Sequence, residues 1–297
     1  MTASVSPHPV DHLVLPVSNL DVSRERLGKL GFTVAADGRH PFGTNNACVF
    51  LSDNTYLEPL AIANQDECEA AAANGNVFVA RDQAFRFRCG DDGFSGIGFG
   101  TADAAVDHAR FISDAVSGGD MLEFFRPSRM PDGTEFSAGF KLAFAADLRS
   151  PDFFFFCCQR VNPVPSDRSP LETHFNGVLG ISEVVLCEPE PRTFEAFLKS
   201  ASGGADVMRH AFGITAQAAN CRIIILTPEG MEAFFDLSPV TEGRGLRGKA
   251  IVFKIRDLGV TEAHLAANGV TYTRKNNRIL VKPTPGQGAL FAFEEIS

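Results

Sequence analysis

The sequence has 297 residues, of which 44% are hydrophobic and 21% charged, the balance of a globular protein with ample material for a buried core. Its 27 Lys and Arg against 36 Asp and Glu give a net charge of −9 without any basic stripe, which excludes binding driven by nucleic-acid phosphates. The apolar runs are far shorter than the ~18 residues of a membrane helix, so we expect no membrane association.

The cysteines and the N-terminal residues bear on the compartment. The cysteine count of 7 is odd, and the sequence has neither a Cys-x-x-Cys pair nor a Cys/His zinc spacing. The first ten residues, MTASVSPHPV, lack the basic and apolar regions of a secretory signal. We therefore expect reduced, mostly buried thiols in a cytoplasmic protein.

The first 62 residues predict one β-α-β-β-β unit. An apolar run over 12–17 predicts a strand, and Asn19 is suited to cap a helix over 20–30 that ends at Gly31. Three extended segments follow, around residues 32–35, 47–51 and 56–62.

The same order of elements returns three times. The copies begin with GIGFGTADAAVDHARFISDAV, GISEVVLCEPEPRTFEAFLKSASG and KAIVFKIRDLGVTEAHLAANG, each of which predicts a strand and then a helix. In the third copy, the segments DVMRHAFG, CRIIILTP and EAFFDLSP are expected to be the strands that follow. Residues 63–93 interrupt the first two copies, and their part QDECEAAAANG has a helical composition.

Four such units predict an α+β fold, because each unit is too small to cover its own sheet. We expect four βαβββ modules that pair into two domains, each with a cup-shaped mixed sheet and helices outside. The domains are expected over residues 1–165 and 166–297, with modules at about 10–62, 94–160, 176–238 and 247–297. The break falls in residues 160–177, which are rich in Pro, Ser and charge.

Three segments of the sequence resemble the glyoxalase-like members of the vicinal oxygen chelate superfamily. They are DHLVLPVSNLD, GRHPFGTNNACVFLSDNTYLEPLAI and HFNGVLGISEVVL. That superfamily includes glyoxalase I, extradiol dioxygenases and bleomycin-resistance proteins. The resemblance implies paired βαβββ modules around a cup that holds a metal or a ligand. It implies much less about function, because the superfamily includes isomerases, dioxygenases, epimerases and non-catalytic binding proteins.

The resemblance also implies two site residues. In metal-binding relatives the ligands lie on the first and last strands of a module, where this chain has His12 and Glu58. An imidazole and a carboxylate suit a divalent ion such as Zn, Ni, Mn or Fe. Glu58 has a second possible role as the general base of a glyoxalase-type isomerisation. For His12 the alternative is a strand-entry histidine bonded to local backbone.

The other modules depart from this ligand pattern. The residues at the corresponding places are Ser95 or Gly96 and Gln159 or Arg160 in the second module, Glu183 and Asp236 in the third, and Ala250 and Glu294 or Glu295 in the fourth. No pair of modules keeps two intact His/Glu pairs, which counts against a tightly bound catalytic metal.

The loop GRHPFGTNN, residues 38–46, is expected to lie at the mouth of the cup. The expected substrate-binding side chains are His40, Thr44, Asn45 and Gln159. Asn46 is expected only to start the next strand. The alternative for the whole loop is turn chemistry, since Gly, Pro, Thr and Asn all favour turns.

Three functions remain open at this point. The first is a lyase or isomerase of glyoxalase type, in which a metal polarises a small oxygen-rich or hydrophobic substrate. The second is an extradiol-type dioxygenase, which needs a second histidine that the strands do not supply. The third is a non-catalytic, bleomycin-resistance-like protein whose Phe-lined cup binds a small molecule. We expect no nucleotide cofactor, because phosphate-binding glycine motifs are absent from the sequence. The chain is expected to be a monomer or a homodimer.

Overall fold

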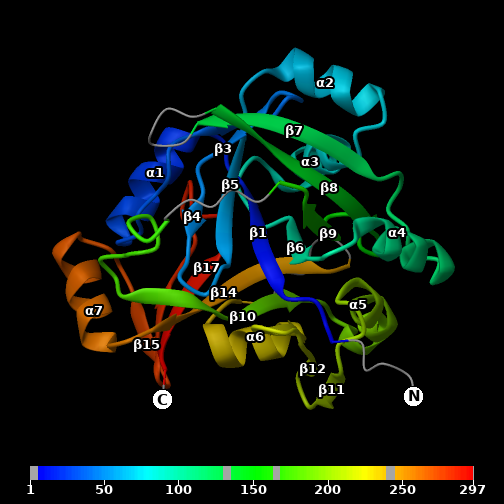
Figure 1. The fold of residues 1–297 in the computed structure, drawn as a ribbon. Coiled ribbons are helices and arrows are strands. Elements are labelled where there is room, and N and C mark those ends of the chain that lie inside the picture. The colour runs from blue at the N-terminus through cyan, green and yellow to red at the C-terminus, as the bar shows by residue number, and fades with distance from the viewer. Residues whose placement is uncertain (1–5, 130–134, 163–167, 239–244, 297) are drawn as a thin grey trace.

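The computed structural model describes residues 6–129, 135–162, 168–238 and 245–296. Within them the chain forms two mixed sheets, the first built by residues up to Arg160 and the second from Val178 onward (Figure 1). The first half contains β1 (Val10–Pro16), α1 (Leu20–Lys29), β2 (Gly38–Arg39), β3 (Thr44–Asn46), β4 (Val49–Phe50), β5 (Tyr56–Ile62), α2 (Gln65–Ala73), α3 (Val77–Cys89), β6 (Gly96–Gly100), α4 (Ala104–Ser113), β7 (Leu122–Arg129), β8 (Glu135–Ala145) and β9 (Phe154–Arg160).

The second half repeats this plan with one helix, α6, at the place that α2 and α3 occupy in the first half. It contains β10 (Val178–Cys187), a 3-10 turn (Pro191–Phe194), α5 (Glu195–Ala201), β11 (Val207–His210), β12 (Gly213–Gln217), β13 (Arg222–Leu226), α6 (Pro228–Phe235), β14 (Arg247–Ile255), α7 (Leu258–Ala267), β15 (Thr273–Lys275), β16 (Arg278–Val281) and β17 (Leu290–Glu295).

The strand order shows the internal repetition. The first sheet runs β2-β3-β5-β1-β6-β9-β8-β7, with β4 also paired to β5, and the second runs β11-β12-β13-β10-β14-β17-β16-β15. In each sheet the first strands of two modules meet antiparallel at the centre, β1 with β6 and β10 with β14. Each of these strands pairs in parallel with the last strand of its own module. The predicted α+β fold of paired modules is confirmed.

Two expected strands are wrong. Residues 32–35 are not a strand, and the short strands β2 and β3 take that place in the module. The first half of the segment EAFFDLSP, residues 232–235, belongs to α6, because Thr227 caps the helix through Gly230 N and Pro228 occupies its first turn, where it costs no hydrogen bond. The last residue of the segment lies outside the described residues. The third module has β12 instead, which the sequence reading missed. A short apolar run fits a strand and a buried helix equally well.

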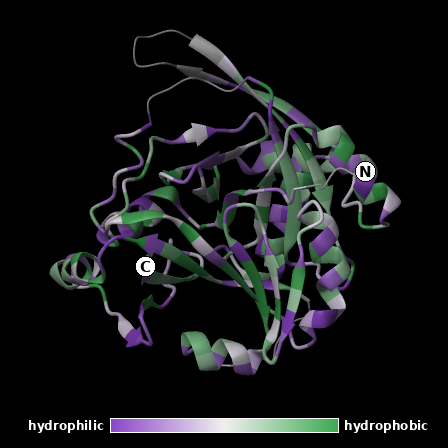
Figure 2. Cartoon of the chain, turned by 60° about the horizontal axis from the view of Figure 1, so that its bottom comes forward, coloured by the Kyte–Doolittle hydropathy of each residue, from purple (hydrophilic) through white to green (hydrophobic). Residues whose placement is uncertain are grey.

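A single apolar cluster joins the outer faces of both sheets. Phe155 of β9 packs against Phe197 of α5, and Phe32 after α1 packs against Phe253 of β14, with ring centroids 5.3 and 5.2 Å apart. Helices α1, α4, α5 and α7 contribute side chains to this cluster. Figure 2 shows that the strands in the middle of the molecule are mostly hydrophobic. The two halves therefore share one core.

The concave faces of the sheets have separate apolar clusters. In the first cup, Phe78 and Val79 of α3 pack against side chains of β8 and β9, and in the second cup Met231 and Phe235 of α6 cover β13 and β14. The longest helix of the described ranges, α3, has 13 residues. Among the residues that the structure describes, no helix is both long and apolar enough to cross a membrane.

Candidate functional site

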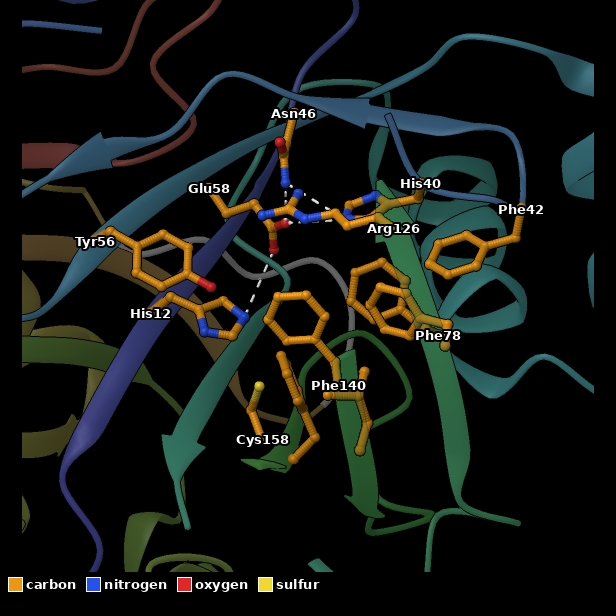
Figure 3. A pocket seen from close by; sticks show the side chains of 13 residues that line it. His12, His40, Phe42, Asn46, Tyr56, Glu58, Phe78, Arg126, Phe140 and Cys158 are labelled. Carbon is orange, nitrogen blue, oxygen red and sulfur yellow. Dashed lines mark hydrogen bonds and ion pairs between the residues drawn. The ribbon is translucent and has the colours of Figure 1, made fainter. Parts of the chain in front are cut away.

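The cup of the first sheet brings His12 and Glu58 together. Strands β1 and β5 lie side by side with Leu13 opposite Leu57, and both of these leucines belong to the shared core. Because successive strand residues point to opposite faces, the neighbouring His12 and Glu58 point into the cup. Figure 3 shows their side chains next to each other, with 3.6 Å between His12 Nε2 and Glu58 Oε2.

These two side chains belong to a largely aromatic pocket. Its lining residues are His12, His40, Phe42, Asn46, Tyr56, Glu58, Phe78, Phe124, Arg126, Phe140, Leu142, Phe156 and Cys158. The cavity between them is narrow, with about 30 Å³ of free volume for water-sized molecules. The edges of the sheet meet over it, because Phe42 before β3 and Phe124 on β7 lie 5.1 Å apart between ring centroids. The cup is therefore nearly closed.

The His12 ring is fixed on three sides. It stacks on Tyr56 at 4.6 Å and meets the edge of Phe156 at 5.1 Å, both between ring centroids. Its Nδ1 forms a hydrogen bond of 2.8 Å with Asp11 Oδ2, and Arg160 donates to the other oxygen of Asp11 at 2.7 Å. Nε2 is thereby left facing Glu58. The imidazole is thus bonded to a carboxylate, not to local backbone.

Asp11 is an ionised partner for this ring. Burial acts to raise the pKa of Asp11, but the hydrogen bond and charge of His12, together with Arg160, outweigh it and hold the pKa below its ordinary value. Burial and the charges of Asp11 and Glu58 raise the pKa of Tyr56, so its hydroxyl stays protonated at neutral pH.

Glu58 lies between two imidazoles although it is only 5% exposed. Asn46 Nδ2 donates to Glu58 Oε1 at 2.6 Å, and His40 Nε2 lies 3.8 Å from the same oxygen. Burial lowers the pKa of His40 to about 4; the charge of Glu58 opposes this shift and that of Arg126 adds to it. His40 is therefore neutral at neutral pH, and its Nδ1 lies 2.9 Å from Thr44 Oγ1.

The other expected site residues divide between the pocket and its surroundings. His40 lines the pocket, and Thr44 supports it from behind. Asn45 lies between Thr44 and Asn46 on β3 and so points to the opposite face, where its Oδ1 is buried without a hydrogen-bond partner. Asn46, expected only to start a strand, is the residue that holds Glu58.

Gln159 lies outside the cup. On β9, Phe156 and Cys158 line the pocket, so the alternation turns Gln159 toward the helices. There its Oε1 accepts a hydrogen bond of 3.1 Å from Ala104 N, at the first turn of α4. Its position indicates a helix-capping role and does not bring it to the substrate.

Comparison with known proteins now places the chain in a family. Residues 10–201 match the family described as "Glyoxalase-like domain", which is more than half of the sequence. The chain belongs to the glyoxalase-like domain family. No protein with a curated description matches the sequence significantly.

Solved structures show the same fold at low sequence identity. A hypothetical protein from Staphylococcus aureus is 13% identical, with a TM-score of 0.67 over 97% of this chain and 99% of that chain. A mutant of 4-hydroxymandelate synthase from Streptomyces coelicolor is 14% identical, with a TM-score of 0.61 over 98% of this chain and 93% of the other. The Mn(II)-bound glyoxalase from Novosphingobium aromaticivorans is 10% identical, with a TM-score of 0.55 over 98% and 83%. The latter two are members of the vicinal oxygen chelate superfamily.

The pocket of this glyoxalase-like protein does not fit a tightly held metal. The first module supplies His12 and Glu58, but the concave positions of β6 in the second module are Gly96, Gly98 and Gly100. A Cβ at Gly98 would lie 2.6 Å from His12 Cε1, so the imidazole fills the space that a second ligand would need.

The other possible metal ligands of the pocket, His40 and Cys158, do not complete a metal site. His40 lies near the other oxygen of Glu58, but in the described part of the chain the ligand atoms of His12, His40 and Glu58 do not all lie within 4.8 Å of one another. Burial and the charge of Asp11 raise the pKa of Cys158, which keeps this thiol protonated. Two ligands beside a cationic Arg126 are too few for a catalytic metal, whose protein sites supply three or more.

A second group of possible ligands lies outside the cup. His8, Asp107 and Cys157 place ligand atoms within 4.8 Å of one another. However, His8 Nε2 is bonded to Asp107 at 2.8 Å and Arg110 lies 2.6 Å from the same oxygen. Burial raises the pKa of Cys157 well above that of an ordinary thiol. Asp107 is thus an ion-paired carboxylate on the helix-facing side of the sheet, and its partners are His8 and Arg110.

The second cup has different residues at the equivalent places. Glu183 corresponds to His12, as predicted, but the register of β10 and β13 puts Ile224 at the place of Glu58. Asp236, predicted there, is instead the residue that ends α6 in a left-handed conformation. The β9 position of Cys158 is occupied in β17 by Glu294.

Proposed function

We propose that this protein is an enzyme of the lyase or isomerase class that moves a proton on a small molecule bound in the first cup. The observation that carries the proposal is the position of Glu58, a carboxylate buried among aromatic rings and placed 3.6 Å from His12 Nε2. A buried carboxylate beside an imidazole is a suitable pair for general acid–base catalysis. The likeness in fold to a glyoxalase supports the same reaction class.

Glu58 has the role of the base that takes a proton from a carbon next to a carbonyl group. Its Oε1 is held by Asn46, which leaves Oε2 to face the cavity and His12. His12 is the second proton carrier, because Asp11 fixes its Nδ1 and leaves Nε2 to exchange a proton with the substrate oxygen. On a substrate with a hydroxyl group on that carbon, a proton removed by Glu58 and one given to the carbonyl oxygen by His12 produce an enediol. Return of the proton from Glu58 to the former carbonyl carbon, with loss of the hydroxyl proton to His12, completes an isomerisation.

The aromatic walls have a part in this chemistry. Phe78, Phe140 and Phe156 line the cavity and leave room for little water in it. In such surroundings a charged base acts on the substrate without competition from solvent. No step is assigned to a metal, because the pocket lacks the donors for one.

The dioxygenase alternative has less support. It requires two histidines and a carboxylate that leave open positions on one metal. The pocket holds His12, His40 and Glu58, but among the described residues their ligand atoms do not all lie within the 4.8 Å of one another that one metal would need.

A hydrogen-exchange experiment tests the proposed function. Wild-type protein in D₂O is incubated with a panel of small aldehydes, ketones and 2-oxo acids, and NMR follows deuterium entering the carbon next to the carbonyl. We expect exchange of at least one compound, with a loss of about 10²–10⁴-fold in Glu58→Gln, because the amide cannot accept the proton.

The matched control is Glu183→Gln, which removes a buried carboxylate from the second cup. This variant is expected to retain the exchange rate of the wild type. Compounds that bind with no exchange above the rate in buffer would contradict the proposal and favour a non-catalytic binding protein. Exchange that Glu58→Gln leaves intact would contradict the assignment of the base.

A further inference from the structure

Arg126 is a charged residue of the pocket to which the proposed proton transfer gives no role. It lies on β7, the edge strand of the first sheet, and reaches into the pocket beside Asn46 and His40 (Figure 3). Among the described residues, no carboxylate lies within ion-pair distance of its guanidinium, and its Nε is buried without a hydrogen-bond partner. An unpaired guanidinium in an apolar pocket is costly to maintain unless a ligand satisfies it.

The surroundings of Arg126 hold the guanidinium in place without neutralising it. Its charged group lies over the ring of Phe140, 5.3 Å from the ring centroid. Gly38 of β2 leaves room for it, since a Cβ there would lie 3.0 Å from Arg126 Nη1. The only carboxylate among the described lining residues is Glu58, which is bonded to Asn46. Among the described residues, the guanidinium therefore has no charged partner of its own in the pocket.

The lining of the pocket narrows the kind of anion, although the cavity of about 30 Å³ must widen by movement of its phenylalanine side chains to admit one. Nε and a terminal nitrogen of arginine together form a fork that matches the two oxygens of a carboxylate. A phosphate dianion would need further donors, and Arg126 is the only Lys or Arg among the described lining residues. Beyond the guanidinium the walls are Phe78, Phe140 and Phe156, which suit an apolar or aromatic body.

We propose that the pocket takes a small monocarboxylate whose carboxylate is bound by Arg126 and whose apolar body lies among the phenylalanine rings. This rests on the proposed function in one respect, namely that the reacting carbon would then lie beside Glu58. Arg126 is thus a specificity-determining residue, and the substrate class is that of apolar carboxylic acids carrying a carbonyl group.

Calorimetric titration with charged and uncharged probes tests this proposal. The probes are 3-phenylpropanoate and its amide, 3-phenylpropanamide, which differ in charge and little in shape. Wild-type protein is expected to bind the acid about 10- to 100-fold more tightly than the amide. Arg126→Gln is expected to abolish this preference, and Arg126→Lys to keep part of it, because lysine retains the charge and loses the fork.

The matched control is Arg39→Gln on β2, the strand at the opposite edge of the sheet, whose arginine is exposed and pairs with Glu67. It is expected to keep the wild-type preference. Equal binding of acid and amide by the wild type, absence of binding of the acid, or an unchanged preference in Arg126→Gln would each overturn the proposal.

The titration also separates this proposal from the proposed function. Glu58→Gln is expected to bind 3-phenylpropanoate at least as tightly as the wild type, because binding of the acid requires no proton transfer. Acid binding that depends on Arg126, without exchange of any compound in D₂O, would support the carboxylate site and contradict the enzyme. Exchange confined to uncharged ketones would support the enzyme and overturn the carboxylate site.

Discussion

The two cups have the same strand plan and different charge pairing. In the second cup Glu183 occupies the position of His12, and it forms ion pairs with both Arg222 and Arg278. Arg278 also pairs with Glu294 at 2.7 Å, so the acidic and basic groups at this end of the cup neutralise one another. The cleft beside them is wider than the pocket of the first cup, at about 390 Å³.

In the first cup, Glu58 and Arg126 lack oppositely charged partners among the described residues. Glu58 has the amide of Asn46 and two imidazoles as neighbours, and Arg126 has no ion-pair partner among the described residues. Buried charges without a charged partner reduce stability, and functional sites are where proteins retain them. The two cups therefore differ in the pairing of their charges as well as in the width of their clefts, and the proposed function belongs to the cup whose charges lack charged partners.

Removing the carboxylate at residue 183 should have the largest effect on stability. Glu183→Ala leaves Arg222 without its partner and Arg278 with Glu294 alone. We expect a loss of about 3 kcal/mol in the free energy of unfolding, measured in urea. Glu58→Gln should change it by less than about 1 kcal/mol, because the amide oxygen still accepts from Asn46. Equal losses in the two variants would remove the distinction between the cups.

The free energy of unfolding should depend on pH through the buried His40 of the first cup. Its pKa is about 4 in the folded protein against an ordinary 6.5, so the unfolded chain holds more protons between these values. The stability contribution is present in full above pH 6.5 and is lost as the pH falls toward 4, by about 2–3 kcal/mol. Urea titrations of wild type and His40→Gln at several pH values should show a shallower slope in the variant. Parallel curves would contradict the burial of a neutral imidazole.

Replacement of Gly98 by alanine should destabilise the first cup, because the new methyl group would meet the ring of His12. The equivalent residue of the second cup is Val252, which shows that the strand position tolerates a side chain. In the first cup the new Cβ would meet His12 Cε1 at 2.6 Å, so we expect Gly98→Ala to cost about 1–2 kcal/mol of stability and to slow exchange.

A double variant checks the cause of this effect. In a His12→Ala background the cost of Gly98→Ala should fall to about zero, because the ring that it meets is gone. A cost that persists in that background would show that the glycine serves the backbone and not the imidazole.

The sequence was sufficient to predict the approach of His12 and Glu58, but not their immediate partners. That prediction came from the resemblance to metal-binding relatives, and in the structure Leu13 and Leu57 face the shared core, so that His12 and Glu58 face the cup. Asn46 lies on a strand of three polar residues, so no hydrophobic pattern indicates which of its side chains face the cup. The prediction for Gln159 was wrong by one strand position: its neighbour Cys158 faces the cup, and Gln159 faces the helices.

Arg126 could not be predicted as a pocket residue for a different reason. It lies on an edge strand at the far end of the sheet from His40 and Phe42, and only the curvature of the sheet brings them together. Ring centroids of His40 and Phe124 are 5.8 Å apart in the folded protein. Such curvature depends on packing across the whole cup, which local sequence patterns do not contain.

Exchange activity after metal removal tests the central claim most directly. The purified protein is treated with a strong chelator, its metal content is measured, and deuterium exchange of the best compound of the panel is followed in wild type and Glu58→Gln. We predict that the chelated wild type exchanges at its original rate and that the variant is inactive with or without added Mn²⁺. Loss of exchange on chelation, with recovery on addition of Mn²⁺, would contradict the account.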